Sequence, residues 1–579
     1  MKNIFILCIA MINITCSNAQ TYITNVSIAD VKNEKFNYNQ TVVIKNGIIT
    51  EINKSSAMKL PENAEIIDGS GKYLIPGLVD AHVHFFQSGG LYTRPDVIDL
   101  REFKSYEKEI TEVNAEMEDK LRRYVQNGIT TVIDVGSTFN LLEKRKEFQD
   151  KSYAPSIFMT GPLLTTYEPE VYKGRGENEP FILTKSVQDG IDGVQKQLKY
   201  NPDFIKIWYI AGADGLSVEE SARKNLPIIK AIIEEAHKNG LKVAVHATQN
   251  ITAQLAVENG ADILVHSVND KVISEEFIKV LKKNNVILCP TLTVMHGYNK
   301  TFAQSHNFSE YELEYSNPFQ LGSLLDLKHI PDTTMVHRLK THSTSKESKE
   351  RVKRTDSINK VNLKLLSDAD VTIATGTDAG NIGTLHATSY LKEVLAMKAS
   401  GMNTWQILKA STINGAKILD KEEELGSIEK GKLANMVLLN NNPVDNIEHL
   451  TKINTVINKG KVMMPDQLVV ITPEALAQQQ LNAYNQRNIE AFLKPYAEDV
   501  KVFTFPNQLM YEGKGMMRQG YTNMFNNTPN LHCELVNRII KGNVIIDQES
   551  VQYGNQIIKA VAIYRIKDDK ISEVYFVRN

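Results

Sequence analysis

Strand-like and helical segments alternate along most of this chain, and that alternation limits the folds open to it. Eight short apolar runs lie between residues 77 and 379, separated by helical stretches. Such an alternation is typical of an α/β fold, and eight units favour a (β/α)8 barrel of the TIM type. The predicted strands are residues 77–84, 130–136, 156–161, 204–209, 242–247, 263–268, 286–292 and 372–379. We place the barrel at residues 76–420.

Two β-rich blocks flank this region, at residues 20–75 and 421–468. In the first block, Asn46-Gly47 lies between two β-rich runs, which is a hairpin signal. In the second, Lys459-Gly460-Lys461 reads as a turn. We expect the two blocks, although distant in sequence, to pair into one small β domain.

Two further segments lie outside this pattern. Residues 296–367 form a long polar segment that includes a charged run at 343–350. This run favours a charged helix or flap over the barrel mouth, and a solvated excursion without a function is the alternative. After Val470, Thr472 as N-cap and Pro473 in the first turn predict a helix. Strand-like runs follow at residues 500–505, 531–540, 543–553, 557–566 and 571–577. Residues 475–579 are therefore predicted to form a separate α+β domain.

Residues 1–19 have the pattern of a secretory signal peptide. Lys2 precedes a largely apolar run at residues 4–14, and the small residues Ser17 and Ala19 precede a cleavage site. We expect an exported protein, periplasmic or extracellular. A buried N-terminal helix is one alternative, and a lipoprotein anchored at Cys16 is another, although the residues before Cys16 make a poor lipobox.

Composition and cysteine usage exclude several classes of protein. A formal net charge of −2 gives no basic surplus for nucleic-acid binding. No internal apolar run reaches the ~18–20 residues of a membrane span. Outside the predicted signal only Cys289 and Cys533 remain, in different predicted domains, so we expect neither a disulfide framework nor a cysteine-based zinc motif. Any metal must be held by histidine and carboxylate.

A histidine pair stands at the carboxyl end of the first predicted barrel strand, where the active sites of such barrels lie. Residues i and i+2 of a strand share a face, so His82 and His84 point together. Two imidazoles at this spacing make a ready pair of metal ligands. Alone the pair is a weak signal, but here it follows the run 76–80, Pro-Gly-Leu-Val-Asp.

Four more polar residues lie near the ends of other predicted strands. Lys206 interrupts an apolar strand, and a buried ammonium facing the helices would cost several kcal/mol, so it should face the barrel interior. Carboxylated by CO2, it would become an anion able to bridge two metal ions. The same parity turns His246 and His266 inward, and Asp378 shares a face with small residues. Taken singly, such histidines are more often core or helix-cap residues. Asp378 could likewise be the N-cap residue of the next helix.

The chain resembles the amidohydrolase superfamily, and within it the imidazolonepropionase-like group. The resemblance covers residues 21–468 and rests on the motifs YLIPGLVDAHVH (73–84), GITTVID (128–134), GTDAG (376–380) and GSIEKGKLA (426–434). It implies a metal-bearing barrel and a small β-sandwich built from residues 20–75 and 421–468. Two departures are Asn435, where the family usually has Asp, and Val265, where an acidic residue often precedes the histidine.

The resemblance also implies a role for each polar residue. His82, His84 and Asp378 would hold the more buried metal. His246 and His266 would hold the second, with carboxylated Lys206 as the bridge. Some relatives lack the lysine and use one metal, so its presence favours two divalent ions, with zinc expected.

By this reading, a metal-bridging hydroxide hydrolyses a C–N bond of a small molecule, and Asp378 shuttles the proton to the leaving nitrogen. An amide, a dipeptide-like substrate or a cyclic amide fits. A deaminase or lactonase using the same site, or a non-catalytic binding protein, are the alternatives. His386, Tyr209 and His296 are weak candidates for substrate contact, and His386 is equally an ordinary helix-start histidine.

The C-terminal segment is similar to the nuclear-transport-factor/ketosteroid-isomerase-like (polyketide-cyclase-like) cone. The similarity covers residues 475–579 and rests on LNAYNQRNIEAF (481–492), YAEDV (496–500) and AVAIYRIKDDKI (560–571). It implies a curved sheet that often dimerises, so we expect a homo-oligomer, and some such cones hold a small apolar ligand. His532 and Asp547 are possible pocket residues, which strand alternation alone also explains. A binding or dimerisation role would make deletion of 475–579 change oligomeric mass more than turnover.

Overall fold

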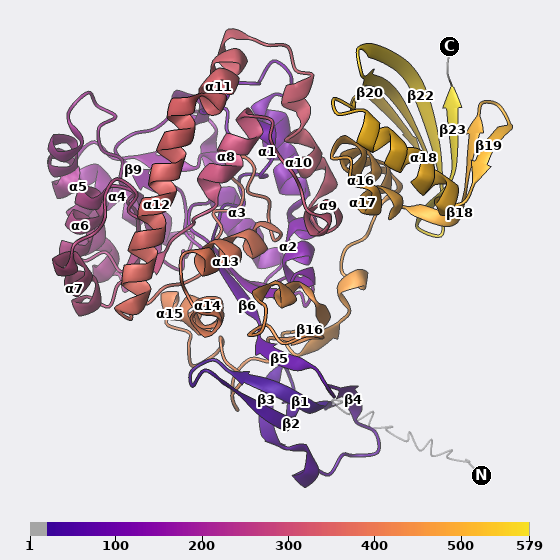
Figure 1. Cartoon of the computed structure of the whole chain (residues 1–579). Helices are drawn as coiled ribbons and strands as arrows, with labels where there is room; N and C mark the ends of the chain where they lie inside the picture. The colour runs from indigo at the N-terminus through magenta and orange to yellow at the C-terminus, as the bar shows by residue number, and fades with distance from the viewer. Residues whose placement is uncertain (1–19, 578–579) are drawn as a thin grey trace, which may run out of the picture.

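The computed structural model describes residues 20–577, which form three connected parts (Figure 1). The β-rich part near the N-terminus lies below a large α/β part, and the C-terminal part packs at its side. The predicted signal peptide at residues 1–19 lies outside the described residues. Among residues 20–577, no helix combines the length and apolarity that a membrane crossing requires.

Strands from both flanks of the chain join in one eight-stranded sheet of order β17-β16-β15-β5-β1-β2-β3, with β4 beside β1. The junction is β15, which pairs antiparallel with β5 and sets Met436 opposite Pro76. Asn46 and Gly47, both with positive φ, form the hairpin turn between β2 and β3. The strands are β1 (Thr21–Asp30), β2 (Lys35–Lys45), β3 (Ile48–Lys54), β4 (Glu65–Asp68), β5 (Tyr73–Pro76), β15 (Met436–Leu439), β16 (Ile453–Asn458) and β17 (Lys461–Met463).

The central part contains two parallel sheets, one of three strands in the order β6-β7-β8 and one of six in the order β10-β9-β11-β12-β13-β14. Seven of their strands overlap the predicted barrel strands, whereas β9 and β10 were not predicted. The strands are β6 (Leu78–Val83), β7 (Ile129–Asp134), β8 (Ser156–Met159), β9 (Leu163–Thr165), β10 (Phe181–Leu183), β11 (Ile205–Trp208), β12 (Val243–His246), β13 (Ile263–Val265) and β14 (Ile287–Cys289).

The predicted eighth strand, residues 372–379, is wrong as a continuous strand. This segment makes only isolated parallel bridges, between Ile373 and Leu288 and between Ala379 and Val83. Its backbone turns at Asp378, where φ is 58°, so an extended ladder cannot continue. The described residues therefore show two parallel sheets rather than one continuous eight-stranded ladder, and the closed barrel stays a prediction.

Helices cover the outer faces of these sheets (Figure 1). Their apolar sides join the outward side chains of the strands in one large core, which includes Val132, Ile207, Val245 and Ile232. The helices are α1 (Tyr106–Ala115), α2 (Met117–Gln126), α3 (Phe139–Lys144), α4 (Val187–Leu198), α5 (Val218–Lys238), α6 (Asn250–Glu258), α7 (Glu275–Lys283), α12 (Lys346–Asp368), α13 (Ser389–Ala399), α14 (Thr404–Ala410) and α15 (Ile413–Ile418).

The long polar segment before residue 372 is helical and forms an insertion over one end of the sheets. It consists of α8 (Val294–Phe302), α9 (Glu310–Tyr315), α10 (Pro318–Ser323) and α11 (Thr334–Thr344), and it leads into α12. The charged run at 343–350 spans the junction of α11 and α12, where the Ser345 side chain caps α12 by accepting from Ser348 N. This run is therefore helical, apart from the Ser345 cap, and a role as a flap stays a prediction.

The C-terminal part combines three helices with a mixed six-stranded sheet of order β19-β18-β23-β22-β21-β20. Its first helix begins where predicted, with Thr472 accepting from Ala475 N at 3.1 Å and Pro473 in the first turn. Strand β19 was not predicted. The elements are α16 (Pro473–Asn485), α17 (Ile489–Leu493), α18 (Lys514–Asn527), β18 (Tyr496–Thr504), β19 (Gln508–Glu512), β20 (His532–Lys541), β21 (Val544–Tyr553), β22 (Gln556–Lys567) and β23 (Lys570–Val577).

The C-terminal part and the insertion share an interface formed by α16 with α9 and α10. Asn482 donates to the Pro318 carbonyl at 2.7 Å, and one apolar cluster runs from Leu313 and Leu321 in the insertion to Leu476 and Ala477 in α16. Because this apolar cluster belongs to both parts, separating the C-terminal part from the insertion would expose apolar surface.

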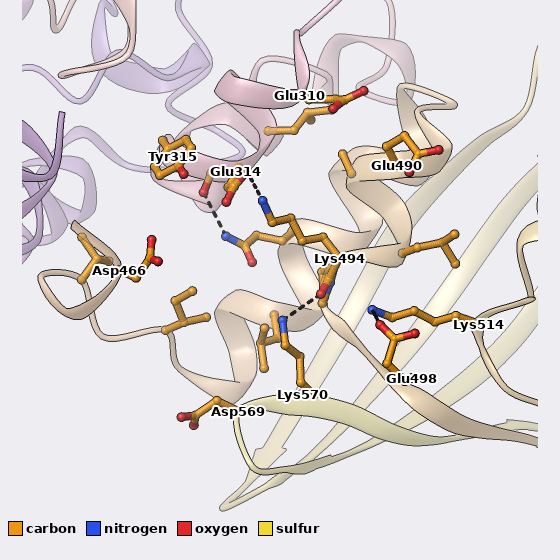
Figure 2. Close-up of a pocket in the computed structure, with 18 of the residues that line it drawn as sticks. Glu310, Glu314, Tyr315, Asp466, Glu490, Lys494, Glu498, Lys514, Asp569 and Lys570 are labelled. Atoms are coloured by element: carbon orange, nitrogen blue, oxygen red, sulfur yellow. Dashed lines mark hydrogen bonds and ion pairs between the residues drawn. The ribbon is translucent and has the colours of Figure 1, made fainter. Parts of the chain in front are cut away.

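Beside this interface lies a charged cavity of about 680 Å³ (Figure 2). Lys494 of the C-terminal part pairs with Glu314 of α9 across it. Lys570 donates to the Lys494 carbonyl at 2.9 Å, and Lys514 pairs with Glu498 at 2.8 Å. The Lys494–Glu314 pair joins the two parts, whereas the other two lysine contacts lie within the C-terminal part.

Candidate metal centre

Three side-chain atoms meet at the carboxyl end of β6. His82 Nε2 and His84 Nε2 lie 3.3 Å apart, and Asp378 Oδ1 lies 3.2 Å from the first and 3.1 Å from the second. Two ligands at ~2.0–2.1 Å from a tetrahedral zinc ion stand about 3.3–3.4 Å apart. The three atoms therefore have the spacing of ligands around one metal ion.

The histidines are oriented by the strand and by the backbone beyond it. His84 Nδ1 lies 2.9 Å from the Gly136 carbonyl, which can only accept, so Nδ1 carries the proton and Nε2 is left with its lone pair. His82 is fully buried, and its Nδ1 has no hydrogen-bond partner among the described residues. Its Nε2 is the ring nitrogen that faces His84 and Asp378.

The loop that carries Asp378 is clamped onto β6. Asp378 N donates to the His82 carbonyl at 2.7 Å, and Thr377 donates to Asp80 from both its backbone nitrogen, at 3.0 Å, and its hydroxyl, at 2.8 Å. A Cβ at Gly376 would stand 2.7 Å from the His82 Cβ, so only glycine permits this approach. The strained φ of Asp378 is thus held by its surroundings, as is common at functional sites.

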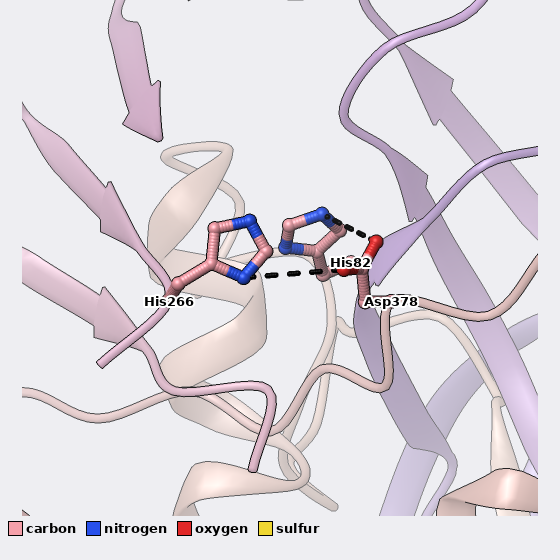
Figure 3. A group of neighbouring side chains, drawn as sticks. All are labelled: His82, His266 and Asp378. Atoms are coloured by element: carbon pink, nitrogen blue, oxygen red, sulfur yellow. Dashed lines mark ion pairs between the residues drawn. The ribbon is translucent and has the colours of Figure 1, made fainter. Parts of the chain in front are cut away.

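His266 completes a group of potential ligands at the end of β13 (Figure 3). Ligand atoms of His82, His266 and Asp378 all lie within 4.8 Å of one another. His266 has a φ of 76°, and its Nδ1 lies 2.6 Å from the Thr291 hydroxyl and 3.9 Å from Asp378 Oδ2. The His246 ring centroid is 4.3 Å from that of His266, which brings the end of β12 into the same group.

Lys206 lies on β11, beside β12, and is 1% exposed. It lines the same cavity as His246 and His266. Burial disfavours the ammonium form and lowers the pKa of Lys206 to about 7, with Asp378 opposing the shift. A large fraction of this amine is therefore uncharged near neutral pH.

The protonation states suit metal binding, which needs neutral imidazoles and an ionised carboxylate. Burial lowers the pKa of His82 to about 3 and those of His246 and His266 well below their usual range. Burial alone would raise the pKa of Asp378, but its interactions with His82 and His84 outweigh this effect and hold it well below the usual range. The donor set is thus four imidazoles, one carboxylate and a potential lysine ligand.

The group opens into a cavity of about 240 Å³. Five of the six predicted ligands line it, and His82 lies beneath them with 0% exposure. Aromatic and apolar side chains form one wall, including Phe181, Trp208 and Met295. A small, partly apolar cavity over converging polar groups is typical of a small-molecule site.

Three residues that the sequence analysis did not identify support Asp378. Asn381 Nδ2 donates to Asp378 Oδ1 at 2.8 Å, and its Oδ1 accepts from Arg94 Nη1 and from the Tyr298 hydroxyl, both at 2.7 Å. Asn381 directly follows the 376–380 motif, which was an available signal. Arg94 and Tyr298 lie on a loop and on α8, far from any motif, and nothing in the sequence pointed to them.

The three weak candidates occupy other places. His386 packs against Phe85 and Tyr124 and lies 2.9 Å from the Gln87 carbonyl, outside the cavity lining. The Tyr209 hydroxyl donates to the Ala222 carbonyl at 2.6 Å and is likewise absent from the lining.

His296 lies 3.1 Å from Asp356, which does line the cavity. His386 and Tyr209 are thus packed in the core, where substrate contact would need a rearrangement. His296 does not line the cavity itself but contacts Asp356, which does.

Comparison with known proteins agrees with both predicted resemblances. The amidohydrolase family model matches residues 73–463, and the SnoaL-like domain model matches residues 477–574. An imidazolonepropionase of Clostridium tetani is 25% identical over 475 residues, covering 75% of this chain and 93% of that protein. An enamidase of Eubacterium barkeri is 26% identical over 239 residues, covering 39% of this chain and 50% of that protein.

Solved structures share the fold. A Xaa-Pro dipeptidase with bound methionine in its active site superposes with a TM-score of 0.56 at 22% identity, covering 77% of this chain and 100% of that one. The ochratoxinase of A. niger gives 0.57 at 17% identity, covering 78% and 96%. Because the family model spans more than half of the sequence, the chain belongs to the amidohydrolase family, as a hydrolase that acts on carbon–nitrogen bonds, with a SnoaL-like domain at residues 477–574.

Proposed function

We propose that this chain is a metal-dependent amidohydrolase that cleaves an amide bond of a small molecule in the cavity above His82, His84 and Asp378. The observation that carries the proposal is the triangle of ligand atoms, 3.1 to 3.3 Å on each side, in a family that is generally metal-dependent. Neutral imidazoles and an ionised carboxylate at this spacing are the donor set that zinc prefers.

A divalent cation held there supplies a Lewis acid for the scissile carbonyl and lowers the pKa of coordinated water. Asp378 is the group that moves the proton. Its carboxylate accepts a proton from the attacking water and passes it to the leaving nitrogen. Asn381 keeps the carboxylate in place by donating to Oδ1, so the proton acceptor does not swing away from the cavity.

We further propose that Lys206 is carboxylated and bridges two metal ions, with His246 and His266 on the second. The neutral amine attacks CO2, an N–C bond forms, and the nitrogen loses a proton, which leaves an anionic carbamate with two oxygens. The buried, cavity-facing position of Lys206 and its lowered pKa favour the neutral amine that this reaction needs.

The lysine proposal is tested by metal analysis of wild type and the Lys206→Ala variant. We expect two ions per wild-type chain and one per variant chain, and a wild-type intact mass that includes one added CO2 under non-denaturing conditions. Two tightly held ions in a well-folded Lys206→Ala protein would argue against the bridge.

The cavity size and its aromatic wall favour a peptide-like or cyclic amide of about dipeptide size. Among the similar proteins, one is a Xaa-Pro dipeptidase and one an enamidase, which supports this range of substrates without selecting one. A panel of dipeptides, N-acyl amino acids, cyclic amides, aminated heterocycles and lactones separates the alternatives. Hydrolysis confined to lactones, or ammonia release alone, would replace the amidase proposal with a lactonase or a deaminase.

Metal dependence is tested in the same assay. We expect a chelator to abolish turnover and zinc to restore it. A chelated protein that retains its turnover would contradict the proposal, whichever substrate is used.

Three proposals concern the chain as a whole. Closure of the barrel is supported by hydrogen bonds that attach residues 372–379 on both sides, from Ala374 N to Leu288 O at 2.8 Å and from Ala81 N to Thr375 O at 2.9 Å. Export rests on the signal pattern of residues 1–19, and cell fractionation tests it. A homo-oligomer rests on the likeness of the C-terminal domain to dimerising cones, and light scattering tests it.

A further inference from the structure

Positive charge is concentrated in one segment of the chain. Residues 334–360, which form α11 and the first part of α12, contain eight Lys and Arg residues and three Asp and Glu residues, a net charge of +5. Because the whole chain has a formal net charge of −2, the remaining residues together carry −7. An anionic partner is therefore attracted to this segment and repelled by the rest of the molecule.

The lysines of this part of α12 line up on one side of the helix. They recur at intervals of three, four and seven residues, and such spacing keeps side chains on one helical face. All four are exposed, whereas Asn362 and Leu366 are buried on the opposite side, against the body of the protein. We call this set the basic face: Lys346, Lys349, Lys353 and Lys360.

Little of the charge on the basic face is neutralised by the protein. Among residues 20–577, no carboxylate forms an ion pair with Lys349, Lys353 or Lys360, and Lys346 reaches Glu350 only at 3.8 Å. The lysines of the interface cavity in Figure 2 are, by contrast, held by carboxylates or by a carbonyl. The basic face therefore remains available to an external anion.

Two apolar side chains are exposed beside the basic face. Val361 and Leu365, about one helical turn apart on α12, are 42% and 38% exposed. Lysine and apolar side chains together suit the headgroup region of a bilayer, where ammonium groups meet lipid phosphates and apolar groups enter the acyl boundary. Clusters of about four to eight Lys and Arg on such a helix are typical of binding to anionic lipids. A soluble polyanion would use the lysines alone.

The basic face also borders the cavity over the candidate metal centre. Asp356, three residues after Lys353 and four before Lys360, lines that cavity. Residues three and four apart are neighbours on a helix surface, so these lysines flank the cavity wall. In Figure 1, α11 lies at the end of the molecule opposite the N-terminal strands.

We propose that the basic face docks this protein on the surface of a bilayer that carries anionic headgroups. The four lysines contact lipid phosphates, and Val361 and Leu365 enter the interface. Because Asp356 lies between two of the lysines, docking holds this rim of the cavity at the lipid surface. The docking needs no hydrolysis, so its test stands apart from that of the proposed active site.

The test is sedimentation of the full-length protein with lipid vesicles. We expect binding to vesicles of phosphatidylcholine mixed with phosphatidylglycerol to be about tenfold tighter or more than binding to phosphatidylcholine alone. Raising the salt concentration from low to physiological should weaken this binding, because exposed charges are screened. The triple variant Lys349→Gln/Lys353→Gln/Lys360→Gln should lose about tenfold or more in affinity for the mixed vesicles.

Two further variants complete the test. Lys279→Gln/Lys282→Gln/Lys283→Gln removes three exposed lysines from α7 and is the matched control, which should bind as wild type does. Val361→Ser/Leu365→Ser should weaken binding to the mixed vesicles several-fold and leave retention on heparin, a soluble polyanion, unchanged. Because the substituted side chains are exposed, the melting temperatures of all three variants should match that of wild type.

The proposal is refuted by equal binding to the two kinds of vesicle, or by equal losses in the α7 and α12 lysine variants. Retention on heparin without binding to the mixed vesicles would replace the bilayer with a soluble polyanion. Residues 1–19 are present in every variant, so their apolar run contributes equally to each comparison.

Discussion

The cavity over the candidate metal centre and the cavity of the C-terminal domain are built in opposite ways. The first has about 240 Å³, and six side chains from five chain segments converge on it. The second has about 930 Å³ and mostly apolar walls, and in its lining the Tyr564 hydroxyl donates to Glu549 at 3.1 Å. In the first cavity, side-chain atoms lie at the spacing expected of ligands around one metal ion. In the second cavity, the side chains leave an open volume.

This difference separates two kinds of cavity. Reacting groups must be held in fixed positions, and the candidate metal centre holds Asp378 and His266 in strained backbone conformations. An apolar cavity wall contributes mainly through the apolar surface that it buries. We therefore expect substitutions at the first cavity to act on turnover, and those at the second to act on stability.

Asp378→Asn should give the largest effect. It keeps the size of the side chain and an oxygen for metal, but it removes the proton acceptor. We expect turnover to fall by ~10²–10⁴-fold with metal content retained, measured with whichever amide the substrate panel identifies. The same change at Asp356, on the cavity rim, is the matched control and should cost far less. Equal losses in both variants would remove the distinction between reacting and lining residues.

Deletion of residues 475–579 should give the second-largest effect. A binding or dimerisation role predicts that deletion changes oligomeric mass more than turnover, but the shared apolar core of Leu313, Leu321 and Leu476 adds a loss of stability to that expectation. Exposing even one such leucine costs about 2–3 kcal/mol. We expect the insertion at 303–323 to open more readily and to be cleaved by protease roughly tenfold faster or more. Because Tyr298 of α8 supports Asn381, turnover should fall as well.

If the truncated protein resists protease as wild type does, the interface is weaker than its contacts suggest. The two cavities would then belong to independent units.

The sequence predicted the metal centre better than the C-terminal cavity, and the reason is geometric. Strand periodicity fixes the direction of a side chain, so the inward positions of Lys206 on β11 and His246 on β12 follow from their apolar neighbours. His266 lies one residue beyond β13 with a φ of 76°, so strand parity does not account for its direction. Asp378 was identified although its segment is not a regular strand, because its motif is specific. The hydrogen bonds from Arg94 and Tyr298 to Asn381 could not be predicted, since they join segments that only the fold brings together.

The C-terminal cavity shows the opposite limit. Alternation placed its strands, but the sequence analysis selected His532 and Asp547 as pocket residues. Strand alternation was the stated alternative for both residues. In the structure Asp547 pairs with Arg538, and Glu549, two residues further along β21, lines the cavity. His532 lines a different cavity, beside His329 of the insertion. A cavity is the volume that side chains leave unfilled, and the alternation of residues along a strand does not predict that volume.

Glu393, a buried acid that lines neither cavity, leads to a prediction about how stability depends on pH. Glu393 is 0% exposed, accepts from Leu292 N at 2.8 Å and Thr293 N at 3.1 Å, and lines neither cavity. Burial raises its pKa to about 8. Between about pH 4.5 and 8 the folded carboxyl keeps its proton while the unfolded one loses it, so this group makes stability fall as pH rises.

Glu393→Gln removes that titration and keeps one of the two acceptor oxygens, since Glu393 accepts with Oε1 from Leu292 N and with Oε2 from Thr293 N. The lost acceptor lowers stability equally at every pH, so the pH-dependent part of the difference reports the titration. We expect the variant to gain stability relative to wild type between pH 5 and pH 8, on the order of a few kcal/mol. Melting temperatures of both proteins across this range provide the measurement. A difference that does not vary with pH would show that Glu393 is ionised in the folded protein.

Tyr209→Phe should give the smallest change in turnover and stability, and it tests whether the candidate metal site extends past the end of β11. Tyr209 stands one residue beyond β11, close in sequence to Lys206, which made it a candidate for substrate contact. Its hydroxyl instead donates to the Ala222 carbonyl at 2.6 Å, and the side chain is 1% exposed. Loss of one such hydrogen bond costs about 1 kcal/mol of stability, whereas kcat and KM should both stay within about twofold of wild type. A rise in KM at unchanged stability would mean that the ring turns into the cavity during catalysis, and the inner cavity would then extend past the end of β11.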